Sequence, residues 1–545
     1  MTRSALYVLL IENYYQIPFL ERVMKISFVF PPAWSAAAPS YGMALLGASC
    51  RRAGHEFYGF DLNIDFYRAV DESLHPMWLD DNAVSWYTQK FVDQLVSDHA
   101  TFLGEYADRV LAPRPDILAV SVQTASSLFG LAFAKLVRER APGIFILFGG
   151  PDCFPSERGL SILDSDWVNA ICAGEGDELL PTYIEQLAAN DMRPVEMKGF
   201  CHRRPDGTVF DGGQPGPVMN LDALPYADFT GIDFNQYTIN NRIAMMTSRG
   251  CILRCSFCSE GENFLRYRYR SPESLIEEVA QHVVMLRKVS GIRPHIHFSD
   301  SLINGRPEAL ERFCHMILER GIDFTWGGMA LLRKEMTYEL LSLMRQAGWI
   351  EVMWGMESGS HATLKLMRKK LFDPDLAERI VKDVHSLGVD QCTNVIVGFP
   401  GETEEQFAET VKFVRRIGPY FRSIGLPMME IRRNSHVYAD PDRYNVLDKD
   451  NTVEWQTKDG SNNINVRLAR RQILAEVVAE KLFEQGRYKD LETPTPTATT
   501  VGTETAQLNG RPKMEATLSM SVRRGAKYLL RSWLKNYSSK AGVRT

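Results

Sequence analysis

Residues 251–258 read Cys-Ile-Leu-Arg-Cys-Ser-Phe-Cys, the strongest signal in the sequence. The three cysteines stand four and three residues apart, directly after a predicted strand at Ile243–Thr247. Thiolates are soft ligands that suit zinc or an iron–sulfur cluster. A structural zinc site completes its shell with a fourth cysteine or histidine, and the nearest histidines, His202 and His282, are in no short ligand pair. Three thiolates therefore favour a cluster that leaves one iron open to another ligand.

A regular alternation of strands and helices follows from this point. The predicted strands are Ile243–Thr247, His295–Ser299, Ile322–Trp326, Ile350–Trp354, Cys392–Val397 and Phe421–Leu426. The predicted helices are Pro272–Lys288, Arg306–Glu319, Lys334–Ala347, Asp373–Leu387 and Glu402–Ile417. Six such β/α units are too few for a closed eight-unit barrel, so the sequence predicts an open, partial barrel.

The region before residue 190 shows a second β/α pattern. Its predicted strands are Lys25–Phe30, Ile117–Val122, Ile144–Phe148 and Val168–Cys172, with helices at Tyr41–Arg52 and Gly130–Arg140. This pattern predicts a doubly wound, Rossmann-like parallel sheet, which binds ligands at the carboxyl ends of its strands. The turns there are Phe30-Pro31-Pro32, Ser121 to Thr124, Gly149-Gly150-Pro151 and Gly174-Glu175-Gly176-Asp177. Small residues in them let a flat ligand approach the backbone, although ordinary turn chemistry explains each one singly.

The motif Cys251-x3-Cys255-x2-Cys258, with Phe257 before the last cysteine, resembles the signature of radical S-adenosylmethionine (SAM) enzymes. The resemblance implies that the three cysteines hold a 4Fe-4S cluster whose fourth iron is chelated by SAM. It also implies a partial six-unit barrel and reductive cleavage of SAM to methionine and a 5′-deoxyadenosyl radical.

Two further segments resemble the SAM-contacting parts of that family. Gly355–Ser360 resembles the segment that contacts ribose and methionine, with Glu357 and Ser358 as polar contacts. Asn394–Thr403 resembles the segment that packs against adenine, where Gly398 leaves room for a flat ring. Asp300 is a candidate contact of substrate or SAM, and Trp326 and Arg333 are candidates for the substrate side. A helix cap for Asp300 and ordinary packing for the tryptophan are the alternatives.

The amino-terminal half resembles the cobalamin-binding domain that precedes the barrel in one radical SAM subclass. The residues that carry this resemblance, and are implied as cobalamin contacts, are Ser121, Gly149, Gly150, Pro151, Gly174, Glu175 and Gly176. The chain lacks Asp-x-His-x-x-Gly, through which many such domains supply an axial histidine. Cys153 is either a cobalt ligand or a buried thiol, and residues of its type are usually the latter.

The resemblance implies a cobalamin-dependent radical SAM enzyme that methylates an unactivated carbon of a small-molecule or peptide substrate. The alternatives are an oxidative cyclase or rearrangement enzyme with the same cofactors, a methylthiotransferase, and a non-catalytic cobalamin or cluster sensor. A reductant such as flavodoxin or ferredoxin is the expected protein partner. No residue is assigned as catalytic, and no nucleic-acid partner is expected.

Composition and patterning define the remaining expectations. With 545 residues, 45% hydrophobic and 24% charged, the chain predicts two or three globular domains, and its net charge of −5 argues against general polyanion binding. Nine cysteines without a recognisable signal peptide favour a reducing cytoplasm. The expected segments are an extension of uncertain status (1–23), a cobalamin-binding domain (24–190), a linker with a small hairpin (191–240), the radical SAM barrel (241–440), a helical region (441–490) with a helix from Val466 to about Gln485, a flexible linker (491–515) and a basic amphipathic tail (516–545). That tail either contacts a membrane surface or partner, or packs loosely on its own domain.

Overall fold

The computed structural model describes residues 22–154 and 157–484. The expectations for residues 1–21, for the linker at 491–515 and for the basic tail at 516–545 therefore fall outside the described residues. The chain forms two compact units. The first comprises the chain up to Cys251 together with Asn263–Ile303 and Glu308–Gly327, and the second comprises Ile252–Glu262, Asn304–Pro307 and the chain from Gly328 onward.

The first unit contains a seven-stranded sheet with the order β2-β1-β3-β4-β5-β6-β7. Its strands are β1 (Lys25–Val29), β2 (Glu56–Phe60), β3 (Ile117–Ser121), β4 (Phe145–Gly149), β5 (Ala170–Cys172), β6 (Phe200–Arg203) and β7 (Val209–Asp211). Strands β1 to β5 pair in parallel, which confirms the doubly wound prediction. The β6–β7 hairpin lies in the predicted linker and extends the sheet with antiparallel pairing. The sequence does not predict β2, an edge strand that combines Glu56 with Gly59.

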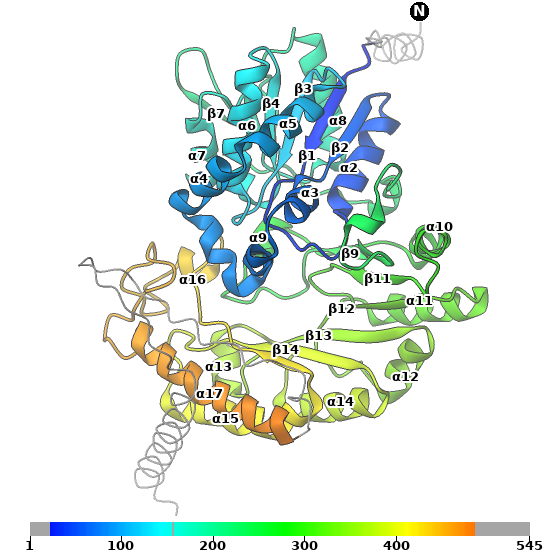
Figure 1. Ribbon diagram of the computed structural model, residues 1–545. Coiled ribbons are helices and arrows are strands. Elements are labelled where there is room, and N and C mark those ends of the chain that lie inside the picture. Colours follow the sequence, from blue (N-terminus) through cyan, green and yellow to red (C-terminus); the bar gives the residue numbers. More distant parts are fainter. Residues whose placement is uncertain (1–21, 155–156, 485–545) are drawn as a thin grey trace, which may run out of the picture. The chain divides into compact units, whose positions relative to one another are not determined.

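Helices cover both faces of this sheet, as Figure 1 shows for α2, α5, α6 and α8. The helices are α2 (Tyr41–Arg52), α3 (Leu62–Ala69), α4 (Gln89–Asp98), α5 (Ala100–Leu111), α6 (Ser127–Arg140), α7 (Glu157–Ser161) and α8 (Gly176–Ala189). Tyr106 and Phe129 belong to the core under α5 and α6, whereas Met43 and Tyr183 belong to the core under α2 and α8. Apolar layers thus cover both faces of the sheet, and the ends of its strands are left uncovered.

Gly150, in the turn after β4, is required by the backbone of its own domain. Its φ is +102°, and a Cβ built there would lie 2.5 Å from the carbonyl oxygen of Val122. We expect Gly150→Ala to lower the free energy of unfolding by about 1–3 kcal/mol or more, because the substitution causes both backbone strain and a steric clash. Thermal unfolding checks this against Gly143→Ala, where no atom lies within 4 Å of the added carbon. Equal melting temperatures for the two variants would contradict the prediction.

The second sheet has six strands in the order β15-β14-β13-β12-β11-β8, which follows the chain and confirms the six β/α units. The strands are β8 (Arg242–Met245), β11 (His295–Phe298), β12 (Thr325–Ala330), β13 (Trp349–Glu357), β14 (Asp390–Val395) and β15 (Ser423–Gly425). The helices are α9 (Glu260–Asn263), α10 (Pro272–Ser290), α11 (Pro307–Arg320), α12 (Tyr338–Gln346), α13 (His361–Leu366), α14 (Pro374–Ser386), α15 (Glu404–Ile417), α16 (His436–Ala439) and α17 (Ile464–Glu484). A two-stranded antiparallel ribbon is formed by β9 (Ser248–Arg249) and β10 (Arg268–Tyr269).

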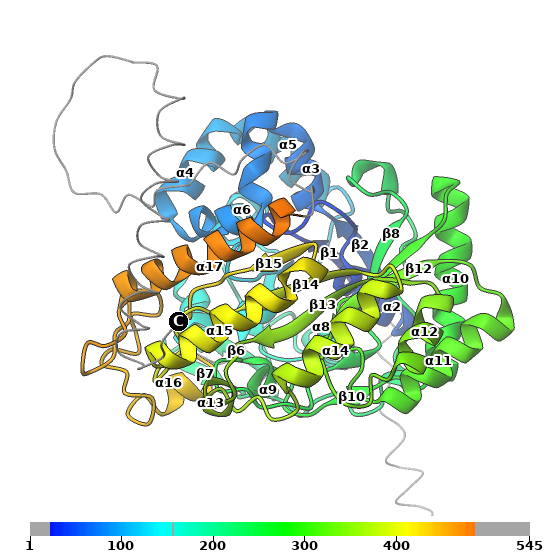
Figure 2. The same ribbon diagram turned by 90° about the horizontal axis from the view of Figure 1, so that it is seen from below.

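The third barrel strand differs most from its predicted range. The sequence places the third strand at Ile322–Trp326, but β12 begins at Thr325 and continues through Gly327 and Gly328. Glycine weakens an isolated strand, yet both glycines are buried here and the sheet tolerates them. In the second unit, α14, α15 and α17 lie side by side (Figure 2). Helix α17 matches the helix predicted from Val466 to about Gln485.

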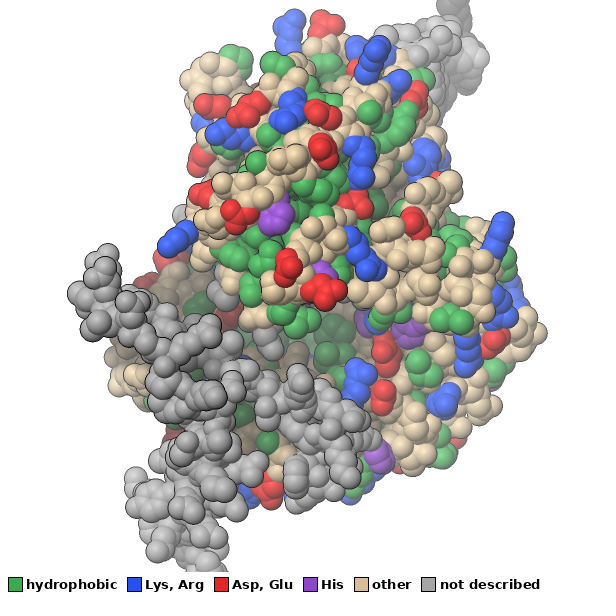
Figure 3. Space-filling view, in the orientation of Figure 1, with side chains coloured by type: hydrophobic (Ala, Val, Ile, Leu, Met, Phe, Trp, Pro, Cys, Tyr) green, Lys and Arg blue, Asp and Glu red, His purple; other side chains and the backbone are tan. Residues whose placement is uncertain are grey.

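The surface of the described residues has mixed charge. On the face shown in Figure 3, Lys and Arg side chains are interspersed with Asp and Glu. Among the described helices, none combines the length and the apolar character that a membrane span requires.

Candidate functional site

The cysteine loop runs from Gly250 to Tyr267, between β9 and β10. Cys255 is buried, whereas Cys251 and Cys258 are half-buried. Ser256 anchors the middle of the loop in the second unit. Its N–H donates to Met367 O (2.9 Å), its hydroxyl donates to Leu366 O (3.1 Å), and its carbonyl accepts from Val437 N (3.1 Å). The segment between Cys255 and Cys258 is therefore held by backbone contacts, and three soft thiolates on one loop suit an iron–sulfur cluster.

Phe257 packs on an apolar cluster of the second unit that includes Phe399 and Trp455. This contact directs the aromatic ring into the core, so the ring helps to fix the loop.

Asp300, at the end of β11, stabilises the approach to the ribbon. The buried carboxylate accepts hydrogen bonds from the backbone and hydroxyl of Thr247 (2.9 and 2.8 Å) and from both groups of Ser248. Burial raises the pKa of Asp300, although these donors oppose the shift. The structure thus gives this residue neither the substrate-facing role nor the helix cap considered from the sequence. Trp326, the other strand-end candidate, is fully buried against Phe298 in the core.

The end of β13 is irregular at the residue predicted to contact SAM. Glu357 has a φ of +71°, and the β13–β14 register shifts between Gly355 and Glu357. A non-glycine residue in this conformation is often found at a functional site. Its carboxylate pairs with the nearly buried Lys369 (3.0 Å). The neighbouring hydroxyl of Ser358 lies 2.9 Å from that of Thr410, so it packs toward α15.

The end of β14 carries the segment assigned to adenine. A Cβ built at Gly425 of β15 would lie 2.1 Å from the side-chain oxygen of Asn394. This oxygen therefore lies directly beside Gly425. Gly398 has a φ of +78°, and its added Cβ would lie 2.5 Å from Cγ of Arg467. Arg467 therefore occupies the space beside Gly398. This packing alone is enough to require a glycine at that position.

The strand-end turns of the first sheet lie at the ends of β3, β4 and β5. A Cβ at Gly149 would make only an ordinary 3.8 Å contact, with Cys172, so the backbone there is accessible. A Cβ at Gly174 would lie 2.3 Å from Pro215, so this glycine is required by internal packing. Asp152, which follows Pro151, accepts hydrogen bonds from Thr124 (3.0 Å) and Ser127 (2.5 Å). The turns are thus ordered by their own hydrogen bonds.

Four other residues in or beside these turns are placed as follows. Ser121 is the last residue of β3, and its hydroxyl would lie 3.1 Å from a Cβ at Gly150. Gly176 begins α8, and Glu175 immediately before it forms ion pairs with two arginines. Cys153 is fully buried, and burial raises the pKa of its thiol, which agrees with a buried thiol.

Residues 245–414 match the family model of the radical SAM superfamily. The chain therefore contains a radical SAM domain. The matched range begins at the end of β8 and includes the cysteine loop, so the predicted family is confirmed.

Two curated proteins are similar to a large part of the chain. An uncharacterized methyltransferase of Pyrococcus horikoshii is 25% identical over 402 residues, which cover 73% of this chain and 79% of the relative. An anaerobic magnesium-protoporphyrin IX monomethyl ester cyclase of Rubrivivax gelatinosus is 27% identical over 345 residues. That alignment covers 60% of this chain and 59% of the cyclase.

The fold is shared with a solved structure of the cobalamin-dependent SAM radical enzyme OxsB, with aqua-cobalamin and SAM bound. The two chains superpose with a TM-score of 0.61 at 15% identity, over 86% of this chain and 67% of OxsB. The radical SAM chain described here therefore has the Rossmann-like plus partial-barrel fold of that structure.

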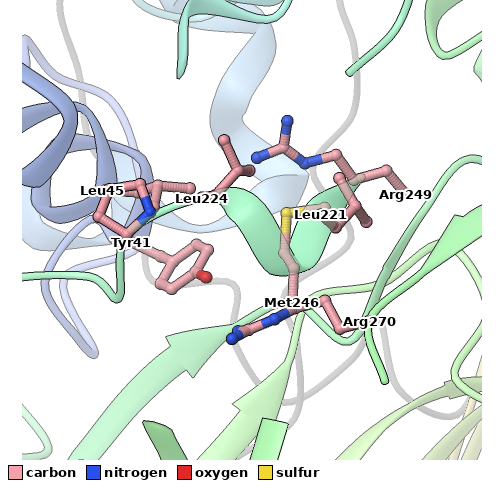
Figure 4. A pocket seen from close by; sticks show the side chains of 8 residues that line it. Tyr41, Leu45, Leu221, Leu224, Met246, Arg249 and Arg270 are labelled. Atoms are coloured by element: carbon pink, nitrogen blue, oxygen red, sulfur yellow. The ribbon is translucent and has the colours of Figure 1, made fainter. Parts of the chain in front are cut away.

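A small pocket lies in the first unit of this radical SAM chain (Figure 4). It is lined by Tyr41, Leu45, Leu221, Leu224, Pro225, Met246, Arg249 and Arg270. Both guanidinium groups are engaged by carboxylates, Arg249 by Asp177 and Arg270 by Glu278. Burial raises the pKa of Tyr41 above its ordinary value, so its hydroxyl stays protonated. The charges around the pocket are balanced, which makes it a poor site for an anion.

Sequence reasoning missed several charged residues that pair or pack beside the candidate residues. They are Arg249, Arg268, Lys369 and Arg467, whereas Asp177 was named only as a member of the turn after β5, without its ion pair. Only Arg249 carried a usable signal, since it stands two residues before Cys251. The others depend on long-range pairing that no local pattern reveals.

Glu402, in the turn after β14, makes the stability of the second unit depend on pH. Burial raises its pKa from 4.5 to about 7, although Arg470 lies 3.0 Å away and opposes the shift. The folded state therefore binds this proton more tightly than the unfolded chain. The resulting stability is fully present below about pH 4.5 and is lost as the pH rises through about 7. We expect Glu402→Gln to flatten the fall in melting temperature between about pH 4.5 and 7. Parallel pH profiles for the variant and the wild type would contradict this assignment.

Proposed function

We propose that this chain is a cobalamin-dependent radical SAM enzyme that methylates an unactivated carbon of a small-molecule or peptide substrate. The observation that carries the proposal is the three-cysteine loop in a radical SAM domain that follows a doubly wound domain. The methyltransferase relative and the fold of OxsB support it. A reductant such as flavodoxin or ferredoxin and a cytoplasmic location belong to the same proposal.

The residues of this chain fit the cluster and SAM. Cys251, Cys255 and Cys258 would supply three thiolates, which is the donor chemistry that iron–sulfur clusters require. We propose that Phe257, Glu357, Ser358, Asn394 and Gly398 form the SAM side of the site. When bound, the cluster and SAM supply one-electron cleavage chemistry that no side chain can provide. The chain itself positions the thiolates through Ser256 and places the Glu357 carboxylate 3.0 Å from the ammonium group of Lys369.

We assign cobalamin to the strand-end turns of the first sheet. The proposed contacts are Ser121, Gly149, Gly150, Pro151, Gly174, Glu175 and Gly176. The accessible backbone at Gly149 is the observation that favours a close ligand here. Because Cys153 is fully buried and the chain lacks the histidine motif, we assign no side chain as cobalt ligand.

A second candidate function is oxidative cyclisation with the same cofactors. The match to the magnesium-protoporphyrin IX monomethyl ester cyclase favours it. A methyltransferase moves the methyl group of SAM to its substrate and a cyclase does not, so methyl transfer to the substrate separates the two proposals.

Anaerobic reconstitution of the full chain with iron, sulfide and hydroxocobalamin tests the proposal. We expect about four irons and one cobalamin per chain, and 5′-deoxyadenosine when dithionite and SAM are added. Methyl-labelled SAM should transfer its label to protein-bound cobalamin. A cluster without cobalamin would contradict the cobalamin assignment, and a chain without a cluster would contradict the whole proposal.

A further inference from the structure

Four buried charges connect the first turn of α8 to the ribbon that closes the cysteine loop. Arg249 binds Asp177 with two parallel hydrogen bonds, Nη1 to Oδ2 (2.6 Å) and Nη2 to Oδ1 (2.9 Å). Glu175 accepts from Arg249 Nη1 (2.8 Å) and from Arg268 Nη1 (2.8 Å). None of the four side chains is more than 11% exposed. Two positive and two negative groups thus balance one another in a nearly dry environment, where such contacts are strong.

The carboxylates are needed where they stand. Arg249 and Arg268 face each other directly across the β9–β10 pair, and like charges at such positions repel. Glu175 bridges the two guanidinium groups and cancels the repulsion. Glu175 is the residue before the first turn of α8 and Asp177 lies in that turn, where the helix dipole also favours acidic side chains.

The ribbon controls both ends of the cysteine loop. A Cβ at Gly250 would lie 2.7 Å from the carbonyl oxygen of Arg266, so the loop enters and leaves through one narrow neck. A backbone hydrogen bond from Arg270 to Thr247 (2.8 Å) extends this closure. The carboxylates of Glu175 and Asp177 therefore contact, through Arg249, the strand that leads directly into Cys251.

We propose that Glu175, Asp177, Arg249 and Arg268 form a latch that couples cobalamin binding to the cluster loop. The inference rests on the proposed function, because Glu175 and Gly176 belong to the turn assigned to cobalamin. The four residues are positioning residues. Occupancy of the turn fixes the carboxylates, the carboxylates fix the ribbon, and the ribbon fixes the loop. By thermodynamic linkage, the factor by which bound cobalamin raises the affinity for the cluster equals the factor by which the loaded cluster raises the affinity for cobalamin.

The test measures the Kd of hydroxocobalamin for the full chain, once with the cluster reconstituted and once after iron removal. For the wild type we expect the cluster to tighten binding by about fivefold or more. In Arg249→Gln and in the double variant Asp177→Leu/Arg249→Met, the two Kd values should agree within about twofold. The double variant removes both members of the buried pair, so it leaves no lone buried charge and is expected to fold. Arg249→Lys keeps the charge without the paired hydrogen bonds, and an intermediate ratio is expected.

Arg287→Gln is the matched control, because it breaks the exposed Arg287–Asp323 pair of the same unit and should keep the wild-type ratio. A wild-type ratio near one, or a folded latch variant with the wild-type ratio, would overturn the latch while leaving the cofactor assignments intact. Failure of the wild type to take up iron or cobalamin would instead reject the proposed function.

Discussion

Alanine at Cys251, Cys255 or Cys258 is expected to abolish SAM cleavage, with a loss of more than about 100-fold. Each thiolate is a direct ligand in the proposed site, and removal of outer partners of metal sites already costs about 10–100-fold. Iron content and dithionite-driven 5′-deoxyadenosine formation are measured together after anaerobic reconstitution.

Cys314→Ala is the matched control. This thiol is fully buried in α11, where alanine suits the helix, and it has no place in the proposed site. It should retain its iron and activity. Wild-type cleavage in any of the three loop variants would contradict the assignment of that cysteine.

Glu278→Ala is expected to destabilise the first unit by about 3–5 kcal/mol, the cost of breaking a buried ion pair. The carboxylate is fully buried in α10 and accepts from Arg270, from His282 (3.3 Å) and from Ala227 N (2.9 Å). Burial alone would raise the pKa of Glu278, but His282 and Arg270 outweigh it and hold the carboxylate ionised. Removal would leave the nearly buried guanidinium of Arg270 without its acidic partner.

The preceding residue supplies the control. Glu277 pairs with Arg320 at the surface, with the two side chains 51% and 40% exposed. We expect Glu277→Ala to cost at most about 1 kcal/mol. Thermal unfolding of the two variants side by side should show a much larger drop for Glu278→Ala, and similar drops would show that the buried pair contributes little.

The sequence predicted the elements that have strong local patterns. The run at Ile117–Val122 and the capped helix at Glu402–Ile417 correspond closely to β3 and α15, since both combine an apolar period with clear boundaries. The edge strand β2 and the full extent of β12 were missed, because glycine inside each strand opposed its local propensity.

The candidate site likewise combines residues that the sequence could predict with residues that it could not. The three cysteines were identifiable from spacing alone, because nine cysteines in 545 residues rarely produce this double spacing by chance. The ion pairs of Asp177 with Arg249, and of Glu357 with Lys369, join residues whose partners are set only by the folded sheets. Gly398 remains a proposed contact of the adenine ring, and the structure adds that Arg467 lies where a Cβ of this residue would project. Glycine indicates close approach but not what approaches.

The most direct test of the central claim is electron paramagnetic resonance of the reduced, reconstituted chain with and without SAM. Three cysteine ligands leave one iron open, so SAM should change the signal of the reduced cluster. Spectra that are identical with and without SAM, in a chain that contains about four irons, would contradict SAM binding at that iron.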